Sequence, residues 1–436
     1  MKLSSLSVFV LSIAAATYLS SCKKEKENNV DSPTCDNSQP PLVMVHGALA
    51  SGDTYASQFM RFSANGFCED RMFVFDWNTV GSDGQDTTRL RLFIDSILAL
   101  TKSKQVVLMG HSAGGTLSYR FCSDSSRAAK VAKYIHIGSS PQTVKAGNGT
   151  IPTLNIWSPG DKVVSGADNP QAENAKLDNK DHYEVATCAE AFVAMYKFIT
   201  GKNPSFTDIR PAATRKVGGR VVTLGENTPI INASIKVYEV DNTTGERKQS
   251  SPSFTFTSDN KGNWGPFEAK SNTYYEFEVN TGKAGDRVVH YYREPFVRNN
   301  PLVYLRTFPS SSSTVGALLS SIPKDDAQSV YVVFSANKAV ISGRDILRVD
   351  TAEISIPKFA ADNATTIAFF LYDGNNNKQS DISSMGFFGS FPFLEAVDMF
   401  LNPENNQKTL FEFNGRKYKV PNWKSNSDGV GIVVFD

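Results

Sequence analysis

The chain has 436 residues, a formal net charge of +1, and 44 acidic against 45 basic side chains. This length exceeds one ordinary hydrophobic core, so we expect two or three domains. The balanced charge excludes the strongly basic surface of a nucleic-acid-binding protein, and we predict no nucleic-acid partner. Four of the five histidines lie before residue 183, which places histidine-dependent chemistry in the first half of the chain.

Residues 1–22 are predicted to be a targeting segment. Their apolar run from Leu6 to Leu19 is too short for a permanent membrane anchor and is followed by Ser-Ser-Cys22. This ending resembles a bacterial lipoprotein signal, in which the cysteine becomes the lipidated first residue. We therefore expect a lipid anchor on Cys22, a polar tether over residues 23–39, and attachment to the outer membrane on its periplasmic or outer face. An ordinary cleaved signal peptide is the alternative.

Strand and helix patterns alternate from residue 41 to residue 201. The predicted strands are 42–45, 72–75, 105–109, 134–137 and 153–157, and the predicted helices are 54–65, 88–101, the segment after residue 112, and 183–198. Helix 88–101 is the clearest, because its large apolar residues recur at the spacing of one helical face. Strands separated by helices predict a parallel sheet, and we place this first domain at residues 40–202.

A G-x-S-x-G motif, Gly110 to Gly114, joins the third strand to the helix that follows it. A serine at such a turn has a strained backbone, and small neighbours let strand and helix approach closely. The turn exposes the Ser112 hydroxyl and places the Ala113 N–H at a helix N-terminus, where it can stabilise an oxyanion. A plain Gly/Ser-rich turn is the alternative, but the flanking elements favour a nucleophile.

A serine nucleophile needs a histidine base. His46 follows the first strand, His111 belongs to the motif itself, and His136 lies inside a strand predicted to be buried. His182 remains as the base, because it lies in a polar loop directly before the last helix.

The acid of such a triad should follow a strand between the serine and the histidine. Asp161 lies in a turn after strand 153–157 and meets this condition. Three rivals, which we expect to be solvated loop carboxylates, are Asp168, Asp178 and Asp181. Asp76, after the second strand, is a further alternative.

The order Ser112, Asp161, His182, with His46-Gly47 after the first strand, resembles the α/β-hydrolase superfamily and in particular its small bacterial lipases and esterases. The resemblance spans about residues 41–200 and implies an α/β-hydrolase catalytic domain, a parallel sheet with flanking helices, at 40–202. It also implies that Ala48 donates a second oxyanion N–H. A plain strand-ending turn is the alternative for His46-Gly47.

Two differences from larger hydrolases indicate whether a lid covers the predicted active site. The antiparallel strands that begin those enzymes are missing, and the interval from Gly138 to Ile151 is too short and too polar for a pair of amphipathic helices. We therefore expect no large lid, and a site open to bulky or polymeric esters. The aromatic segment Phe387–Phe393 could still lean over Ser112 from the C-terminal part of the chain.

The same fold suggests how the remaining cysteines are used in an oxidising compartment. Cys35 and Cys68 would both lie at the sheet edge opposite the active site and could bond. Cys122 and Cys188 would lie on helices that cover opposite faces, and we expect two separate buried thiols.

After residue 202 the pattern changes to short alternating runs. We predict a linker at 203–216, a β-sandwich at 217–308 that resembles the transthyretin-like modules of secreted hydrolases, and a second β-rich domain at 309–436. The expected fold class is therefore an α/β hydrolase followed by two all-β, sandwich-like domains. A scaffold role is favoured for these modules over substrate binding.

The predicted function is a serine carboxylic-ester hydrolase of the lipase or esterase type, acting on fatty-acyl or similar esters. The alternatives are a polysaccharide-acyl or polyester esterase and, from another class, a surface binding lipoprotein on a hydrolase scaffold. We expect no cofactor and no metal; the loop 373–381 has oxygens at alternate positions, as calcium loops do, but lacks their final glutamate, which favours a solvated turn. A monomer is assumed, whose partners are an ester substrate and the membrane.

Overall fold

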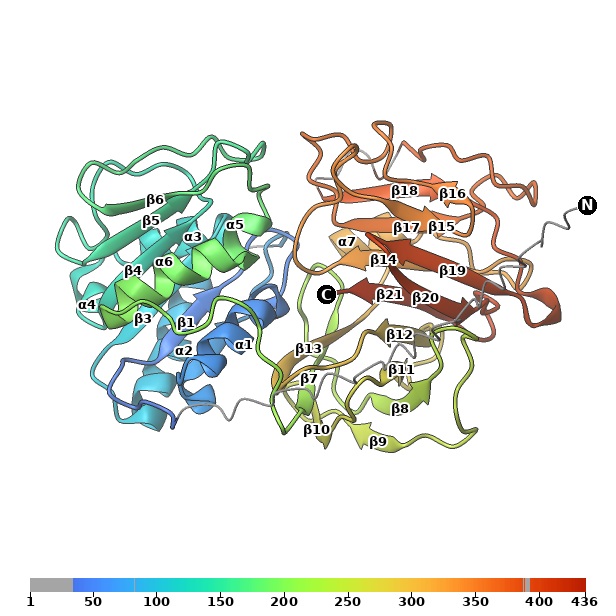
Figure 1. Cartoon of the computed structure of the whole chain (residues 1–436), viewed down its shortest axis with the longest axis horizontal. Helices are drawn as coiled ribbons and strands as arrows, with labels where there is room; N and C mark the ends of the chain where they lie inside the picture. The colour runs from blue at the N-terminus through green and yellow to red at the C-terminus, as the bar shows by residue number, and fades with distance from the viewer. Residues whose placement is uncertain (1–33, 82, 387, 389–392) are drawn as a thin grey trace, which may run out of the picture.

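A computed structural model of the chain describes residues 34–436 except 82, 387 and 389–392. The predicted signal segment, Cys22 and the first part of the tether lie outside the described residues. Figure 1 shows two parts side by side: an α/β domain, residues 34–201, and a β region, residues 216–436. Within the described ranges, no helix is both long and apolar enough to cross a bilayer.

The α/β domain is built on a six-stranded, fully parallel sheet in the order β2-β1-β3-β4-β5-β6. Its strands are β1 (Leu42–Val45), β2 (Met72–Phe75), β3 (Val106–His111), β4 (Val131–Ile137), β5 (Thr153–Trp157) and β6 (Glu173–Lys176). The helical segments are η1 (Gly52–Tyr55), α1 (Ala56–Ala64), η2 (Glu69–Arg71), α2 (Asp86–Thr101), α3 (Ala113–Phe121), α4 (Ser125–Ala128), α5 (Glu184–Thr187) and α6 (Ala189–Thr200). The five predicted strands are present, and β6 is an additional edge strand.

Helices cover both faces of this sheet, and the interior strands β1 and β3 are completely buried. Alternate residues of β1 pack in opposite directions: Met44 belongs to the core shared with α1 and α6, and Val43 to the core shared with α2 and α3. Burial on both faces explains why these strands are continuous apolar runs instead of alternating ones. The predicted helix 183–198 is broken in two, because Cys188 has an extended backbone and caps α6.

The described residues of the β region form three sheets, with strand orders β10-β7-β13, β18-β17-β14-β21-β12-β11-β8-β9 and β16-β15-β19-β20. Its first half comprises β7 (Lys216–Thr223), β8 (Ser234–Val240), β9 (Phe254–Thr257), β10 (Asn263–Glu268), β11 (Tyr274–Asn280), β12 (Val289–Arg293) and β13 (Asn300–Thr307). Its second half comprises α7 (Thr314–Leu319), β14 (Tyr331–Ser335), β15 (Leu347–Val349), β16 (Ala352–Glu353), β17 (Ala368–Tyr372), β18 (Leu394–Asp398), η4 (Glu404–Asn406), β19 (Lys408–Phe413), β20 (Arg416–Pro421) and β21 (Val430–Phe435).

One sheet joins the two halves of the β region. β12 pairs in parallel with the C-terminal strand β21, so that Tyr291 lies opposite Ile432. Both residues belong to one hydrophobic core that also includes Val332 of β14. The two predicted β domains therefore share an eight-stranded sheet instead of forming separate sandwiches, and the boundary between 308 and 309 stays a prediction.

The β region lies against the carboxyl edge of the parallel sheet. Directly after β2, Asp76 accepts a hydrogen bond from the Tyr304 hydroxyl of β13 at 2.6 Å. After β1, the side-chain amide of Asn227 lies 3.3 Å from His46 Nε2, and β13 packs against α1 and η1. The edge at which the sequence predicts an active site is therefore the edge that faces the second part of the molecule.

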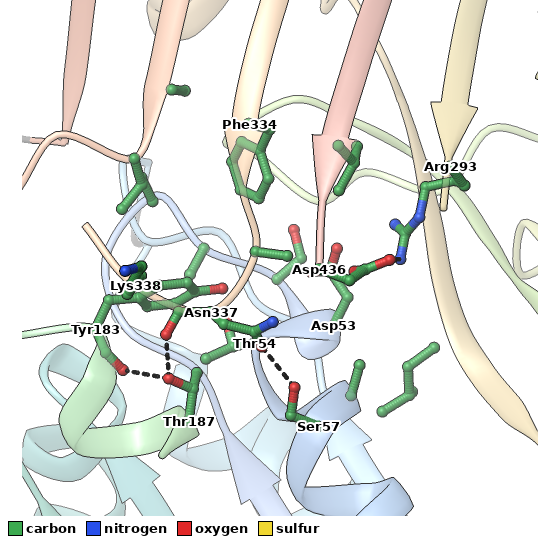
Figure 2. A pocket seen from close by; sticks show the side chains of 18 of the residues that line it. Asp53, Thr54, Ser57, Tyr183, Thr187, Arg293, Phe334, Asn337, Lys338 and Asp436 are labelled. Atoms are coloured by element: carbon green, nitrogen blue, oxygen red, sulfur yellow. Dashed lines mark hydrogen bonds and ion pairs between the residues drawn. The ribbon is translucent and has the colours of Figure 1, made fainter. Parts of the chain in front are cut away.

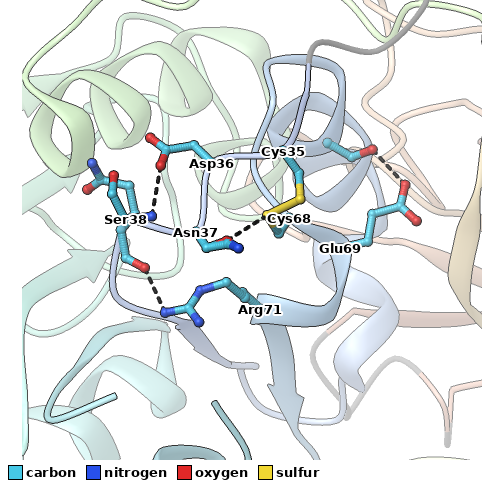
Figure 3. The surroundings of a disulfide bond; sticks show 9 residues. Cys35, Asp36, Asn37, Ser38, Cys68, Glu69 and Arg71 are labelled. Atoms are coloured by element: carbon cyan, nitrogen blue, oxygen red, sulfur yellow. Dashed lines mark hydrogen bonds between the residues drawn. A yellow bond between two sulfur atoms is a disulfide. The ribbon is translucent and has the colours of Figure 1, made fainter. Parts of the chain in front are cut away.

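Cys35 and Cys68 form a disulfide, with their Cα atoms 4.8 Å apart, and Figure 3 shows it beside the segment that leads into β1. The bond ties this segment to the turn after α1, and the Asp36 N–H reinforces it by donating to the carbonyl of Gly66. Cys122 is buried and Cys188 is partly buried, and both are free thiols. The suggested pairing is confirmed.

Candidate active site

Ser112 occupies the turn between β3 and α3 with a φ of 54°, a backbone conformation that residues other than glycine rarely adopt. The turn needs glycine on both sides. A Cβ at Gly114 would lie 2.3 Å from the carbonyl oxygen of Val45, and one at Gly110 would lie 2.4 Å from the carbonyl oxygen of Gly114. These approaches explain why the motif sets its serine between glycines: only they let the helix begin directly over the sheet.

Three of the predicted site residues meet at this turn. His182 Nε2 lies 2.9 Å from Ser112 Oγ, and His182 Nδ1 lies 2.7 Å from Asp161 Oδ2. His182 and Asp161 are buried, whereas Ser112 is partly exposed. The arrangement lets the serine hydroxyl donate to the imidazole, whose other nitrogen donates to the carboxylate.

Asp161 is held as an ionised acceptor. Its second oxygen accepts hydrogen bonds from the backbone N–H groups of Val163 and Val164, both at 2.9 Å. Burial raises the pKa of Asp161, but the hydrogen bond and charge of His182, together with the two N–H donors, outweigh it and leave the pKa below its usual value. A carboxylate in this state can fix the tautomer of the histidine and stabilise its protonated form.

The two predicted oxyanion donors belong to segments that lie next to the serine. Ala113 is the first residue of α3, so its N–H has no acceptor within the helix. Ala48 follows Gly47, and a Cβ on Gly47 would lie 2.9 Å from the Cβ of Ser112. The loop beyond Ala48 is fixed in place, because the Leu49 N–H donates to the hydroxyl of Thr79 at 2.8 Å.

The other three histidines of this domain have structural partners. His46 Nδ1 lies 2.9 Å from the Gly47 carbonyl, and its Nε2 accepts from the Trp77 N–H. His136, which is buried as predicted, lies between the Tyr134 hydroxyl and the Ser140 carbonyl.

His111 has a role that sequence reasoning missed. Its Nε2 lies 2.8 Å from the backbone carbonyl of His182, and the two rings are 4.7 Å apart. Burial, and then the charge of His182, lower the pKa of His111 to about 3, so it is neutral at neutral pH and donates to that carbonyl. It thus positions the backbone of His182; its place next to Ser112 was the only signal in the sequence.

Of the rival acids, Asp168 and Asp76 have other partners. Asp168 and Asp178 are exposed, and Asp168 accepts from the Trp157 indole. The prediction for Asp181, a solvated loop carboxylate, was wrong. Asp181 is buried, because groups of the β region cover it. Asp76 accepts from the Gly52 N–H and the Tyr304 hydroxyl and forms an ion pair with Arg220.

The β region reaches the loop that carries His182. Arg344 pairs with Asp181 at 3.0 Å and with Glu184 at 2.8 Å, and the Ala339 N–H donates to Asp181. The ring of Phe393 stacks on the His182 imidazole, with a centroid separation of 5.9 Å and an angle of 9°. Of the aromatic segment 387–393, Phe387 and residues 389–392 lie outside the described residues.

Two further predictions concern the surroundings of the site. Residues 138–151, where a helical lid was not expected, form bends and turns without a helix. In the loop 373–381, the carboxylate of Asp373 accepts from the Asn377 and Lys378 N–H groups, and Asp381 accepts from the side-chain amides of Asn375 and Asn377. These oxygens are engaged by the loop itself, as in an Asn-rich turn.

Comparison with known protein families agrees with this architecture. Residues 40–152 match the family described as alpha/beta hydrolase fold, and residues 213–309 match the family described as lipase C-terminal domain. Residues 334–436 match a third family, described as a C-terminal domain. The chain thus has an α/β-hydrolase fold followed by β-rich C-terminal domains.

Similar solved structures include a carboxylesterase from Bacillus subtilis, at 12% identity over 39% of this chain and 86% of that one, with a TM-score of 0.30. Naproxen esterase from the same organism is 12% identical over 38% and 85% of the two chains, with a TM-score of 0.30. Lipase B of Aspergillus fumigatus is 16% identical over 40% of this chain and 56% of its own, with a TM-score of 0.32.

Proposed function

We propose that the chain is a serine hydrolase of carboxylic esters, with Ser112 as nucleophile, His182 as general base and acid, and Asp161 as the orienting acid. The observation that carries the proposal is the hydrogen-bonded series from Ser112 Oγ through both ring nitrogens of His182 to Asp161, at 2.9 and 2.7 Å. The matches to the alpha/beta hydrolase and lipase C-terminal families support the ester class.

In the first half of the reaction, Ser112 Oγ attacks the ester carbonyl carbon while His182 Nε2 takes the hydroxyl proton. The oxyanion that forms accepts hydrogen bonds from the Ala48 and Ala113 N–H groups. The bond to the alcohol oxygen then breaks, and His182 returns its proton to that oxygen. The alcohol leaves, and the acyl group remains on the serine.

In the second half, water attacks the acyl carbon and gives a proton to His182 Nε2. The second tetrahedral intermediate collapses when the bond to Ser112 Oγ breaks, and the serine takes back the proton. The carboxylic acid leaves. Throughout, the carboxylate of Asp161 keeps a proton on Nδ1 of the histidine and stabilises the imidazolium.

Replacing the nucleophile tests this proposal. Ser112→Ala should lower the turnover of 4-nitrophenyl butyrate by about 10⁴-fold or more, because the triad acts as a unit. The melting temperature should stay close to that of the parent protein, since the Cβ is kept. Ser140→Ala is the matched control, as this exposed serine lies in the neighbouring loop. Full activity in the Ser112→Ala protein would refute the assignment, and a parent protein inactive on every ester would favour a binding protein.

We also propose that the enzyme is lipid-anchored in the cell envelope through Cys22, as the sequence predicts. Cys22→Ser should move the protein from the membrane fraction to the soluble fraction, because acyl chains and not an apolar helix would hold it there. Fractionation followed by immunoblotting measures this. An unchanged membrane fraction would rule out this mode of attachment.

A further inference from the structure

One side chain of the β region reaches the loop that carries the proposed oxyanion donor Ala48. Asn227 lies in the connection between β7 and β8 and is only 5% exposed. Its amide nitrogen donates to the backbone carbonyl of Ala50 at 2.7 Å and to that of Trp77 at 3.0 Å. Its amide oxygen accepts from the hydroxyl of Ser51 at 2.5 Å. The amide group therefore uses both of its hydrogen atoms and its oxygen on the α/β domain.

The same amide lies against both ends of the loop from His46 to Ala50, whose middle residue is Ala48. At the first end, the amide nitrogen is 3.3 Å from His46 Nε2, and at the second end it binds the Ala50 carbonyl. Because His46 Nε2 accepts from a backbone N–H, Nδ1 carries the proton and donates to the Gly47 carbonyl at 2.9 Å. Asn227 thus contacts the loop on both sides of the residue whose N–H would meet the oxyanion.

The loop needs such support, because its backbone is strained directly after Ala48. Leu49 has a φ of 56°, a conformation that residues other than glycine rarely adopt and that persists only where the surroundings hold it. The Leu49 N–H donates to the hydroxyl of Thr79 at 2.8 Å, and the next carbonyl, that of Ala50, accepts from Asn227. The first contact comes from the α/β domain and the second from the β region. The position of the Ala48 N–H therefore depends on both parts of the molecule.

Packing joins this loop to the β region as well. The partly buried side chain of Leu49 packs against the hydrophobic core of the β region that contains Val315. A Cβ on Gly225, two residues before Asn227, would lie 3.4 Å from Leu49 Cδ2 and 3.2 Å from a methyl group of Val315. The connection between β7 and β8 therefore provides both a surface for the Leu49 side chain and the amide that holds the following carbonyl.

Beyond this loop, the chain lines a cavity instead of packing closely on the β region. The cavity has a volume of about 620 Å³, and most residues from Ala50 to Ser57 line it. Figure 2 shows η1 and α1 on one side of it and strand ends of the β region on the other, joined where Ser57 donates to the side chain of Asn337 at 2.5 Å. Polar contacts thus bridge the two parts here, and those of Asn227 are next to Ala48.

We propose that Asn227 is a positioning residue for the oxyanion site: it fixes the loop of Ala48 so that the N–H of that residue can meet the oxyanion. The β region would then be needed for catalysis by the α/β domain. This inference rests on the proposed function, because it requires the reaction at Ser112. A donor stabilises the oxyanion well only when it is already in place. Since the oxyanion is absent from the bound ester, loss of this support should lower kcat with little change in KM.

Removing the amide is the direct test. Asn227→Gly does so without straining the turn, because glycine tolerates the φ of 58° that Asn227 has. The kcat for 4-nitrophenyl butyrate should fall about 10- to 100-fold while KM changes less than about twofold, because one oxyanion donor is misplaced and not removed. Asn232→Gly is the matched control, since Asn232 lies in the same connection, has a φ of 59° and is exposed.

A transition-state analogue gives a readout that a loss of stability alone would not change. With trifluoroacetophenone, the Ser112 oxygen bonds to the ketone carbon, the hydroxyl proton passes to His182, and the ketone oxygen becomes an oxyanion. Its inhibition constant should rise in Asn227→Gly by about the factor by which kcat falls, and it should stay close to the parent value in Asn232→Gly. A smaller folded fraction would lower the measured kcat but leave this constant unchanged.

A second variant tests the same contact from the α/β domain, should Asn227→Gly fail to fold. Ser51→Ala removes the hydroxyl that donates to the amide oxygen, so the amide holds the loop less firmly. The kcat should fall about threefold to tenfold, and the inhibition constant of trifluoroacetophenone should rise to match. In the double variant the two effects should be less than multiplicative, because both substitutions break one hydrogen-bond network.

The outcomes separate this inference from the proposed function. Ser112-dependent hydrolysis in the parent protein, with the same kcat and inhibition constant in Asn227→Gly and Asn232→Gly, would overturn the role of Asn227 alone. A raised KM with an unchanged kcat would also overturn it, since the side chain would then act on substrate binding. Absence of Ser112-dependent hydrolysis of any ester would overturn both proposals. Parallel losses of kcat and of inhibitor affinity in Asn227→Gly, but not in Asn232→Gly, are the expected result.

Discussion

Two carboxylates at the same edge of one sheet have different partners in this molecule. Asp161 follows β5 and Asp76 follows β2, and both side chains are almost completely buried. Asp161 contacts His182 and two backbone N–H groups of its own turn, whereas Asp76 contacts Arg220 and Tyr304 of the β region. The end of a parallel strand makes a carboxylate available, and its partners decide whether it can orient a histidine, as we propose for Asp161, or joins the α/β domain to the β region, as Asp76 does.

Even the neighbouring histidines support this distinction. His46 Nε2 lies 3.9 Å from Asp76, but that nitrogen accepts from the Trp77 N–H, and the other ring nitrogen bonds to the Gly47 carbonyl. His182 instead has one nitrogen on Asp161 and the other on Ser112. A buried His–Asp pair is therefore a candidate catalytic pair only where the second nitrogen reaches a nucleophile.

The largest effect expected from this comparison is on turnover. Asp161→Asn should lower kcat by about 10⁴-fold, because an amide can donate to Nδ1 and so stabilise the wrong tautomer of His182. Stability should change little by comparison. Steady-state kinetics on a soluble ester, together with thermal unfolding, measure both quantities. A kcat close to that of the parent protein would show that Asp161 is not the acid.

The same substitution at the other strand end should act on stability. Asp76→Asn leaves the Arg220 guanidinium without its carboxylate at a largely buried junction, which should cost about 3–5 kcal/mol of unfolding free energy. The folded protein should keep most of its kcat, since Asp76 does not contact His182. Urea unfolding and kcat per titrated active site measure the two effects. A large loss of kcat without loss of stability would mean that the roles of the two carboxylates are reversed.

A smaller effect on kcat is expected where the β region contacts the loop that carries His182. Arg344→Ala removes the partner of Asp181, the residue before His182, so kcat should fall about tenfold with little change in KM, because the histidine is less well positioned. Arg344→Lys should restore part of this loss. Arg348→Ala is the matched control, since Arg348 pairs with Glu353 on the same region. Equal kcat values in the Arg344→Ala and Arg348→Ala proteins would show that the contact between the β region and the loop that carries His182 does not affect catalysis.

The comparison also shows what the sequence could predict. The nucleophile turn is encoded locally, by an apolar strand, glycines around Ser112 and a helix, and the chain order then singles out His182 and Asp161. Asp76 stayed open as a rival because its partners, Arg220 and Tyr304, follow it by more than 140 residues. Spacing within one segment does not report such contacts.

The same reason explains the other differences. The pairing of β12 with β21 and the burial of Asp181 by Arg344 both join segments that are far apart in the chain. Short alternating runs predicted that this region is rich in β-strands, but alternation fixes which face is buried and not which strand lies alongside. The stacking of Phe393 on His182 was foreseen only as a possible approach of that segment to Ser112.

Covalent labelling of the nucleophile tests the central claim most directly. A fluorophosphonate reacts with a serine that an adjacent histidine activates, and the phosphonyl group stays attached to the oxygen. Intact-mass and peptide analysis of the full chain should find one adduct, on the peptide that contains Ser112. Asp161→Asn should slow its formation strongly, and Asp76→Asn should leave the labelling rate of the folded protein close to that of the parent. Labelling at another residue, or ester hydrolysis that survives complete labelling of Ser112, would contradict the account.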